Sequence, residues 1–178
     1  MGRIIIVLLS ENSEVILGAL KRSLEQTFIR VVQTRVKIRS LDNTYDHSRN
    51  QYLSPKLLAR LRRIKRGSSD KVLGVVDVDL YSPDFDFIFG EAEISSGVAT
   101  LSLYRLRPER YGLPPDAKTF EERVIKEAVH ELGHLFGLGH CTNTKCAMHF
   151  STSLADVDRK GKAFCSKCQQ WLKENIFL

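Results

Sequence analysis

The pattern HExxHxxGxxH, between His130 and His140, constrains this chain more than any other feature of its sequence. Side chains four residues apart on a helix point to nearly the same side, so His130 and His134 can face one ion. A helix continued past Gly137 would carry His140 to another face, whereas a glycine in the left-handed conformation turns the chain back. The pattern therefore predicts a helix that ends at Gly137 and a return of His140 toward the other two imidazoles.

These residues are typical of a hydrolytic zinc site. Three neutral imidazoles suit Zn²⁺ and leave a fourth position for water. Glu131 would lie beside the ion, where it could take a proton from a zinc-activated water and pass it to a departing amine. We expect hydrolysis of amide bonds, with Glu131 as general base and acid and His130, His134 and His140 as the metal ligands.

The two remaining histidines, His47 and His149, are interpreted as ordinary surface or core residues.

The four cysteines all follow this pattern, as CxxxxC and then CxxC: Cys141, Cys146, Cys165 and Cys168. Two disulfides are the alternative interpretation, but a CxxC pair suits one metal ion better than it suits a cross-link. The apolar run Ile4 to Leu9 leads into polar residues without the cleavage site of a secretory signal, which favours reduced thiols. We therefore expect a cytoplasmic protein in which these four cysteines hold a second, structural zinc.

Apolar patterning elsewhere alternates between the periods of strands and helices. Strands are predicted at 2–9, 30–38, 71–80, 86–90 and 97–106, and helices at 13–27, 54–64, 119–137 and 166–177. Thr119 is the expected cap of the third helix, and Trp171 is expected to pack inward from the last. This order predicts the α/β class, with a mixed, mostly parallel twisted sheet and packed helices that include the one bearing HExxH.

The predicted division of the chain falls after Gly137. Residues 1–137 are expected to form an N-terminal α/β subdomain that ends with the zinc-binding helix. Residues 138–178 are expected to form a small, irregular C-terminal subdomain that contains His140, Met148 and the cysteine zinc site.

Composition excludes several classes of protein. With 43% hydrophobic and 27% charged residues the chain is typical of globular proteins, which excludes disorder. The run Ile4 to Leu9 is far shorter than the roughly 20 residues that cross a bilayer, so no membrane partner is expected.

The net charge is +6, and the basic residues cluster only at Lys56, Arg60, Arg62, Arg63, Lys65 and Arg66. A nucleic-acid-binding zinc module is one alternative, but no aromatic stacking pattern accompanies the cluster, which favours a solvated helix face.

HExxHxxGxxH followed by Met148 resembles the metzincin metallopeptidases, and the cysteines make the chain resemble the archaemetzincins in particular. In that family a cysteine pair begins directly after the third histidine, a methionine lies two residues past the second cysteine, and CxxC closes the pattern. Here these places are held by Cys141, Cys146, Met148, Cys165 and Cys168. The resemblance implies a metzincin-like fold, a zinc peptidase and a methionine turn beneath the metal. Phe150 stands where several metzincins have a tyrosine, so no tyrosine contribution is expected.

The resemblance also implies a peptide or protein substrate that binds extended along an edge strand. The segment from Phe85 to Gly90 is the candidate edge strand, and we expect a monomer that binds no nucleic acid. The remaining alternative is a catalytically silent homologue that binds zinc and peptide without cleavage. The presence of Glu131 argues against it.

Overall fold

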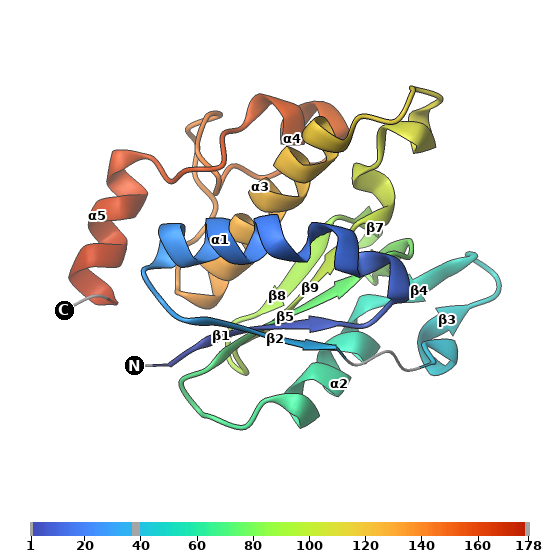
Figure 1. Cartoon of the computed structure of the whole chain (residues 1–178), viewed down its shortest axis with the longest axis horizontal. Coiled ribbons are helices and arrows are strands. Elements are labelled where there is room, and N and C mark those ends of the chain that lie inside the picture. The colour runs from blue at the N-terminus through green and yellow to red at the C-terminus, as the bar shows by residue number, and fades with distance from the viewer. Residues whose placement is uncertain (1, 37–39, 177–178) are drawn as a thin grey trace.

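The structure is a computed structural model that describes residues 2–36 and 40–176 (Figure 1). Ile38 of the second predicted strand and Phe177 of the last predicted helix lie outside the described residues. At the centre is a five-stranded sheet in the order β2 (Val32–Val36), β1 (Ile4–Leu8), β5 (Lys71–Val76), β9 (Val98–Ser102) and β8 (Gly90–Glu93). The first four strands run parallel and β8 is antiparallel to β9. The predicted mostly parallel sheet is confirmed.

Helices cover both faces of this sheet, and its central strands are buried on both sides. Every residue of β1 and of β9 is buried. The helices α1 (Leu17–Phe28) and α3 (Ala117–Leu135) lie on one face, and α2 (Ser54–Ile64) lies on the other (Figure 1). A 3₁₀ turn, η1 (Glu11–Ile16), leads from β1 into α1. This three-layer arrangement places α3 directly against the central sheet.

A second, smaller sheet was not expected from the sequence. It has the order β3 (Tyr45–Asp46), β4 (Gln51–Leu53), β6 (Leu80–Ser82) and β7 (Phe85–Ile88). The single strand predicted at 71–80 is therefore two strands, β5 and β6, in two sheets. Asp77 and Asp79 lie between them and form ion pairs with Arg107 at 2.7 Å and Arg105 at 2.6 Å.

The strand predicted at 86–90 is divided in the same way. Phe85–Ile88 is the strand at one edge of the small sheet, and Gly90–Glu93 is the strand at one edge of the central sheet. Two strand edges therefore lie next to each other in this part of the molecule.

Further short helices connect these elements: η2 (Asp42–Thr44), η3 (Tyr104–Leu106), η4 (Pro108–Tyr111), α4 (Leu154–Arg159) and α5 (Ser166–Asn175). Helix α4 was not predicted, although Ser153 and Asp156 form a capping box at its start. The prediction that Thr119 caps α3 was wrong by three residues. The cap is Asp116, whose carboxylate accepts the Thr119 backbone N–H at 3.1 Å, because the helix begins one turn earlier than the apolar stripe suggests.

The main hydrophobic core includes residues from both sides of the boundary after Gly137, among them Met148, Phe164 and Leu172. The division of the chain at this boundary stays a prediction. Within the described ranges, no helix is both long and apolar enough to cross a lipid bilayer.

Candidate metal centre and cleft

Helix α3 presents the first two histidines and the glutamate between them. Its final turns pack against β5, β8 and β9, so His130 and Glu131 are each only 5% exposed. Gly133 lies one turn from these residues, and a Cβ at this position would collide with the Met148 sulfur. Met148 is itself fully buried. Gly133 is a position that sequence reasoning missed, and the only available signal was a small residue inside HExxH.

The predicted turn at Gly137 is confirmed. Gly137 has a φ of +92°, its N–H donates to the His134 carbonyl at 2.9 Å, and the Leu138 N–H donates to the Gly133 carbonyl at 3.0 Å. These two bonds satisfy the last carbonyls of α3 and reverse the chain, as in a Schellman motif. His140 consequently returns to the helix, with ring centroids 5.3 Å from His130 and 4.8 Å from His134. One ligand nitrogen from each of the three lies within 4.8 Å of the others.

The orientation of the imidazoles fits a cation. Nδ1 of His130 lies 2.8 Å from the Ala147 carbonyl and Nδ1 of His134 lies 2.8 Å from the Leu138 carbonyl. A carbonyl only accepts, so Nδ1 carries the proton and each Nε2 has a lone pair. The two Nε2 atoms are 3.1 Å apart, a repulsive contact for two acceptors that a shared metal ion would resolve. Burial also lowers the pKa of all three imidazoles, most strongly that of His130, which favours their neutral, metal-binding form.

The carboxylate of Glu131 is held between α3 and the edge of the central sheet. A Cβ on Gly90 would lie 2.6 Å from Glu131 Oε1, so the absence of a side chain on β8 makes room for this carboxylate. Burial raises the pKa of Glu131 well above its ordinary value, and the neighbouring charge of Glu127 raises it further. Glu127 itself is fully buried with Lys160, whose ammonium lies 2.8 Å from its carboxylate.

The four cysteines also come together, with all four sulfur atoms within 4.8 Å of one another. The Sγ atoms of Cys141 and Cys165, and those of Cys146 and Cys168, are 3.8 Å apart, well beyond the roughly 2.05 Å of a disulfide. All four are free thiols. The Cys168 backbone N–H is the main cause that lowers the pKa of Cys165 to about 7. Such a cluster of sulfurs suits a closed tetrahedral zinc site.

The remaining histidines lie outside the three-histidine group, as the sequence predicts. His149 contacts the Cys141 carbonyl through Nδ1 at 3.1 Å, and the ring of His47 packs edge-on against Tyr45.

Trp171, expected to pack inward, is 37% exposed and lies over Gly137 instead. Of the basic cluster on α2, Arg62 pairs with Glu93 at 2.6 Å and Lys65 donates to the Ser96 carbonyl at 2.6 Å.

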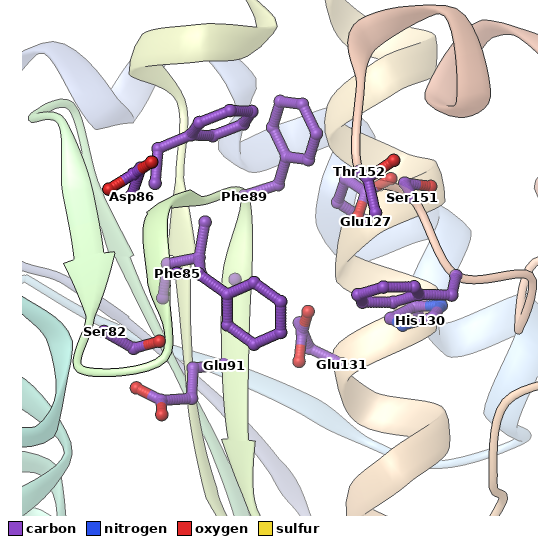
Figure 2. Close-up of a pocket in the computed structure, with 14 residues that line it drawn as sticks. Ser82, Phe85, Asp86, Phe89, Glu91, Glu127, His130, Glu131, Ser151 and Thr152 are labelled. Atoms are coloured by element: carbon purple, nitrogen blue, oxygen red, sulfur yellow. The ribbon is translucent and has the colours of Figure 1, made fainter.

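A cavity of about 300 Å³ adjoins Glu131 and His130 (Figure 2). Its walls come from β6, the strands β7 and β8, helix α3 and the segment after Met148: Ser82, Phe85, Asp86, Phe87, Ile88, Phe89, Gly90, Glu91, Glu127, His130, Glu131, Phe150, Ser151 and Thr152. The rings of Phe85 and Phe150 face each other across it with centroids 6.1 Å apart, and Phe150 also packs on His140 at 4.6 Å. The candidate metal centre therefore opens into a cleft with aromatic walls.

Comparison with known proteins identifies close relatives. The family model of peptidase family M54 matches residues 12–174. The chain is 43% identical over 182 residues to the archaemetzincin of Pyrococcus abyssi, covering 99% of this chain and 97% of that protein. It is 50% identical over 133 residues to the archaemetzincin of Pyrococcus horikoshii, covering 74% of this chain and 71% of that protein.

Solved structures agree with this result. The crystal structure of archaemetzincin from Methanopyrus kandleri has a TM-score of 0.86 at 35% identity and covers 99% of this chain and 96% of its own. The zinc-dependent peptidase from Methanocorpusculum labreanum has a TM-score of 0.87 at 35% identity, with coverage of 95% and 99%.

Proposed function

The chain belongs to peptidase family M54, the archaemetzincins, and is a zinc metallopeptidase. We propose that His130, His134 and His140 bind its catalytic zinc, and that Glu131 transfers a proton from the attacking water to the departing amine. The observation that carries this proposal is the convergence of three metal-competent imidazoles beside one buried carboxylate at the end of a cleft. When bound, a zinc ion on three imidazoles polarises a substrate carbonyl and lowers the pKa of water.

The residues around the ion have separate tasks. Hydrogen bonds from Nδ1 to the Ala147 and Leu138 carbonyls fix the ring orientations of His130 and His134. Glu131 accepts the proton of the attacking water on its carboxylate and delivers it to the nitrogen of the departing amine. Phe85 and Phe150 provide apolar walls on either side of the cleft.

A second zinc is part of the proposal. Cys141, Cys146, Cys165 and Cys168 would hold it in a structural site, because four thiolates complete a tetrahedral shell and leave no open position. Cys141 directly follows His140, so this site would also anchor the chain segment that supplies the third catalytic ligand.

We propose that the substrate is an extended peptide added to the free edge of β8, the strand whose Gly90 lies against Glu131. In this proposal the strand that pairs with the peptide is β8, which follows Phe85–Ile88 in the chain, whereas the sequence suggested the segment from Phe85 to Gly90. We also propose a monomer that acts on peptides in the cytoplasm, without nucleic-acid or membrane partners. The four free thiols support the cytoplasmic location, because thiols stay reduced there.

The test combines metal analysis with peptide cleavage. Purified, reduced protein should contain two zinc ions per chain. Glu131→Ala should retain both ions and lose at least about 100-fold of the cleavage rate, since general acid–base catalysis typically contributes this much. Glu122→Ala is the matched control, because Glu122 is exposed on the same helix and should not alter cleavage.

Full activity of Glu131→Ala would refute the role of Glu131. A parent protein with both zinc ions that cleaves no member of a mixed peptide library would instead indicate a catalytically silent homologue.

A further inference from the structure

The walls of the cleft carry buried acceptors without matching donors. In the part of the chain that the structure describes, Glu91 Oε2 and Ser151 Oγ are buried at the cavity and have no hydrogen-bond partner. A third buried oxygen there, Glu127 Oε1, makes no hydrogen bond beyond its ion pair with Lys160. Buried polar atoms in proteins are nearly always partnered, so each such atom requires an explanation. The Ser151 hydroxyl can donate or accept, but ionised carboxylates only accept, so the oxygens of Glu91 and Glu127 indicate an occupant that donates hydrogen bonds.

The charges in the cleft point the same way. Four carboxylates line it, at Asp86, Glu91, Glu127 and Glu131, and no lysine or arginine is among the lining residues. Asp86 and Glu127 pair with basic residues outside the lining, so the uncompensated negative charge comes from Glu91 and Glu131. A cleft lined by one sign of charge attracts ligands of the opposite sign. The occupant should therefore be a cation.

Glu91 is the carboxylate available to bind that cation. Glu127 pairs with the buried Lys160 at 2.8 Å, and Asp86 is fully exposed and pairs with Arg49 at 3.3 Å. Glu131 serves the reaction itself. Within residues 2–36 and 40–176, Glu91 has no cationic side chain within 4.0 Å. Burial raises the pKa of Glu91, a hydrogen bond with Ser54 partly opposes this, and the charges of Glu93 and Asp84 add to the rise, so a bound cation would stabilise its ionised form.

Strand geometry brings a substrate side chain to Glu91. Side chains alternate between the two faces of a strand, and Gly90 faces Glu131. Glu91 therefore points to the opposite face of β8, and in Figure 2 the ring of Phe85 lies between the carboxylates of Glu91 and Glu131. A peptide paired with the free edge of β8 also alternates its side chains, so every second one lies on the Glu91 side. Opposite charges at such cross-strand positions attract each other.

The aromatic wall suits the rest of such a side chain. Phe85 is 48% exposed and lines the same cavity as Glu91. Lysine and arginine rest their aliphatic stems on apolar surface while the charged end reaches a polar partner, and a guanidinium also stacks on an aromatic ring.

We propose that Glu91 determines specificity, and that this peptidase prefers peptides with a lysine or arginine side chain on the Glu91 side of β8, at a position beside the cleaved bond. This inference rests on the proposed function, because it assumes a peptide bound along β8 and cleaved at Glu131. A free α-amino group carries the same cationic nitrogen, and the peptides are designed to separate these two sources.

The experiment measures kcat/KM for a set of peptides with amidated C-termini that differ at one position: Lys, Arg, Leu, Gln or Glu. Each peptide is tested with an acetylated and with a free N-terminus. The parent should prefer Lys and Arg over Leu by about 10- to 100-fold, the range of a hydrogen bond to a charged group. In Glu91→Gln the Lys-to-Leu ratio should fall to near one, and in Glu91→Lys the preference should shift to the Glu peptide. Asp86→Asn is the matched control, and it should keep the parental ratio because that carboxylate is exposed and already paired.

A second measurement keeps this inference separate from the proposed function. Binding of fluorescein-labelled Lys and Leu peptides to zinc-loaded Glu131→Ala reports selectivity without catalysis. If the parent cleaves Lys and Leu peptides equally, or if Glu91→Gln keeps the parental ratio, the role of Glu91 is wrong while the peptidase assignment stands.

If no peptide is cleaved but the Lys peptide still binds more tightly, and this preference is lost in Glu91→Gln, the specificity stands and the catalytic assignment fails. A preference seen only for peptides with a free α-amino group and a neutral side chain would overturn the side-chain assignment.

Discussion

Replacement of Gly137 by alanine tests whether the left-handed turn delivers the third histidine. Gly137 has a φ of +92°, and a Cβ added to it would lie 2.7 Å from Cη2 of Trp171. The left-handed conformation costs an L-residue about 1–2 kcal/mol. Overpacking against the Trp171 ring adds about 1–3 kcal/mol. The free energy of unfolding should therefore fall by about 2–5 kcal/mol, which is about 4–20 °C in Tm for a domain of this size.

Two other glycines separate these contributions. Gly112 has a φ of +72° and no atom within 4 Å of the added Cβ, so Gly112→Ala should show only the strain of about 1–2 kcal/mol. Gly139 has neither a left-handed φ nor a neighbour within 4 Å, and Gly139→Ala should be within about 0.5 kcal/mol of the parent. Denaturant unfolding of the metal-free proteins measures all three values without a contribution from bound zinc.

Zinc binding completes the test. The turn carries Leu138, whose carbonyl orients His134, and leads to His140. Gly137→Ala should therefore weaken the three-histidine site in a chelator competition and leave the cysteine site unchanged, with a larger effect in Gly137→Val. A Gly137→Ala protein that is as stable as Gly112→Ala and binds two zinc ions with parental affinity would refute the reasoning.

Three further predictions concern other parts of the molecule. Gly90→Ala should lower kcat by about 10- to 100-fold at unchanged zinc content, because the new Cβ, 2.6 Å from Oε1, must displace the buried Glu131; an unchanged kcat would show that this carboxylate moves freely. Cys165→Ser should lose one of two zinc ions and lower Tm while the histidine zinc remains, and full zinc content by elemental analysis would contradict the four-cysteine site. Hydrogen bonds from Arg3 hold the pKa of Asp70 below its ordinary value, so ionised Asp70 stabilises the folded protein. This contribution to the free energy of unfolding should be complete above about pH 4 and should decline as the pH falls through the lowered pKa. Denaturant unfolding of the metal-free parent and of Asp70→Asn from about pH 2 to 6 measures the contribution, and a difference between the two proteins that does not change with pH would contradict it.

The sequence alone determined the features that depend on local spacing. A helix repeats its faces every three to four residues, so the positions of His130, Glu131 and His134 specify one side of α3 independently of the rest of the fold. A glycine after the last helical turn specifies the reversal at Gly137, which the observed φ confirms. The alternation of apolar strands and helices likewise predicts a mostly parallel sheet.

Only the tertiary structure decided which distant segments meet. No spacing in the sequence indicates that Gly90 lies on Glu131, that Met148 fills the space at Gly133, or that Trp171 covers Gly137. The buried pair of Glu127 and Lys160 is equally invisible, because its members are far apart in the chain.

The order of strands in the two sheets also depends on tertiary contacts, and it leaves β8 at the edge of the central sheet. Side-chain pattern identifies a strand but not its neighbours, because strand order depends on which apolar faces bury each other in the folded chain. The sequence could therefore predict that His130, His134 and His140 meet, whereas the cleft beside them arises from the packing of β7, β8 and the segment after Met148.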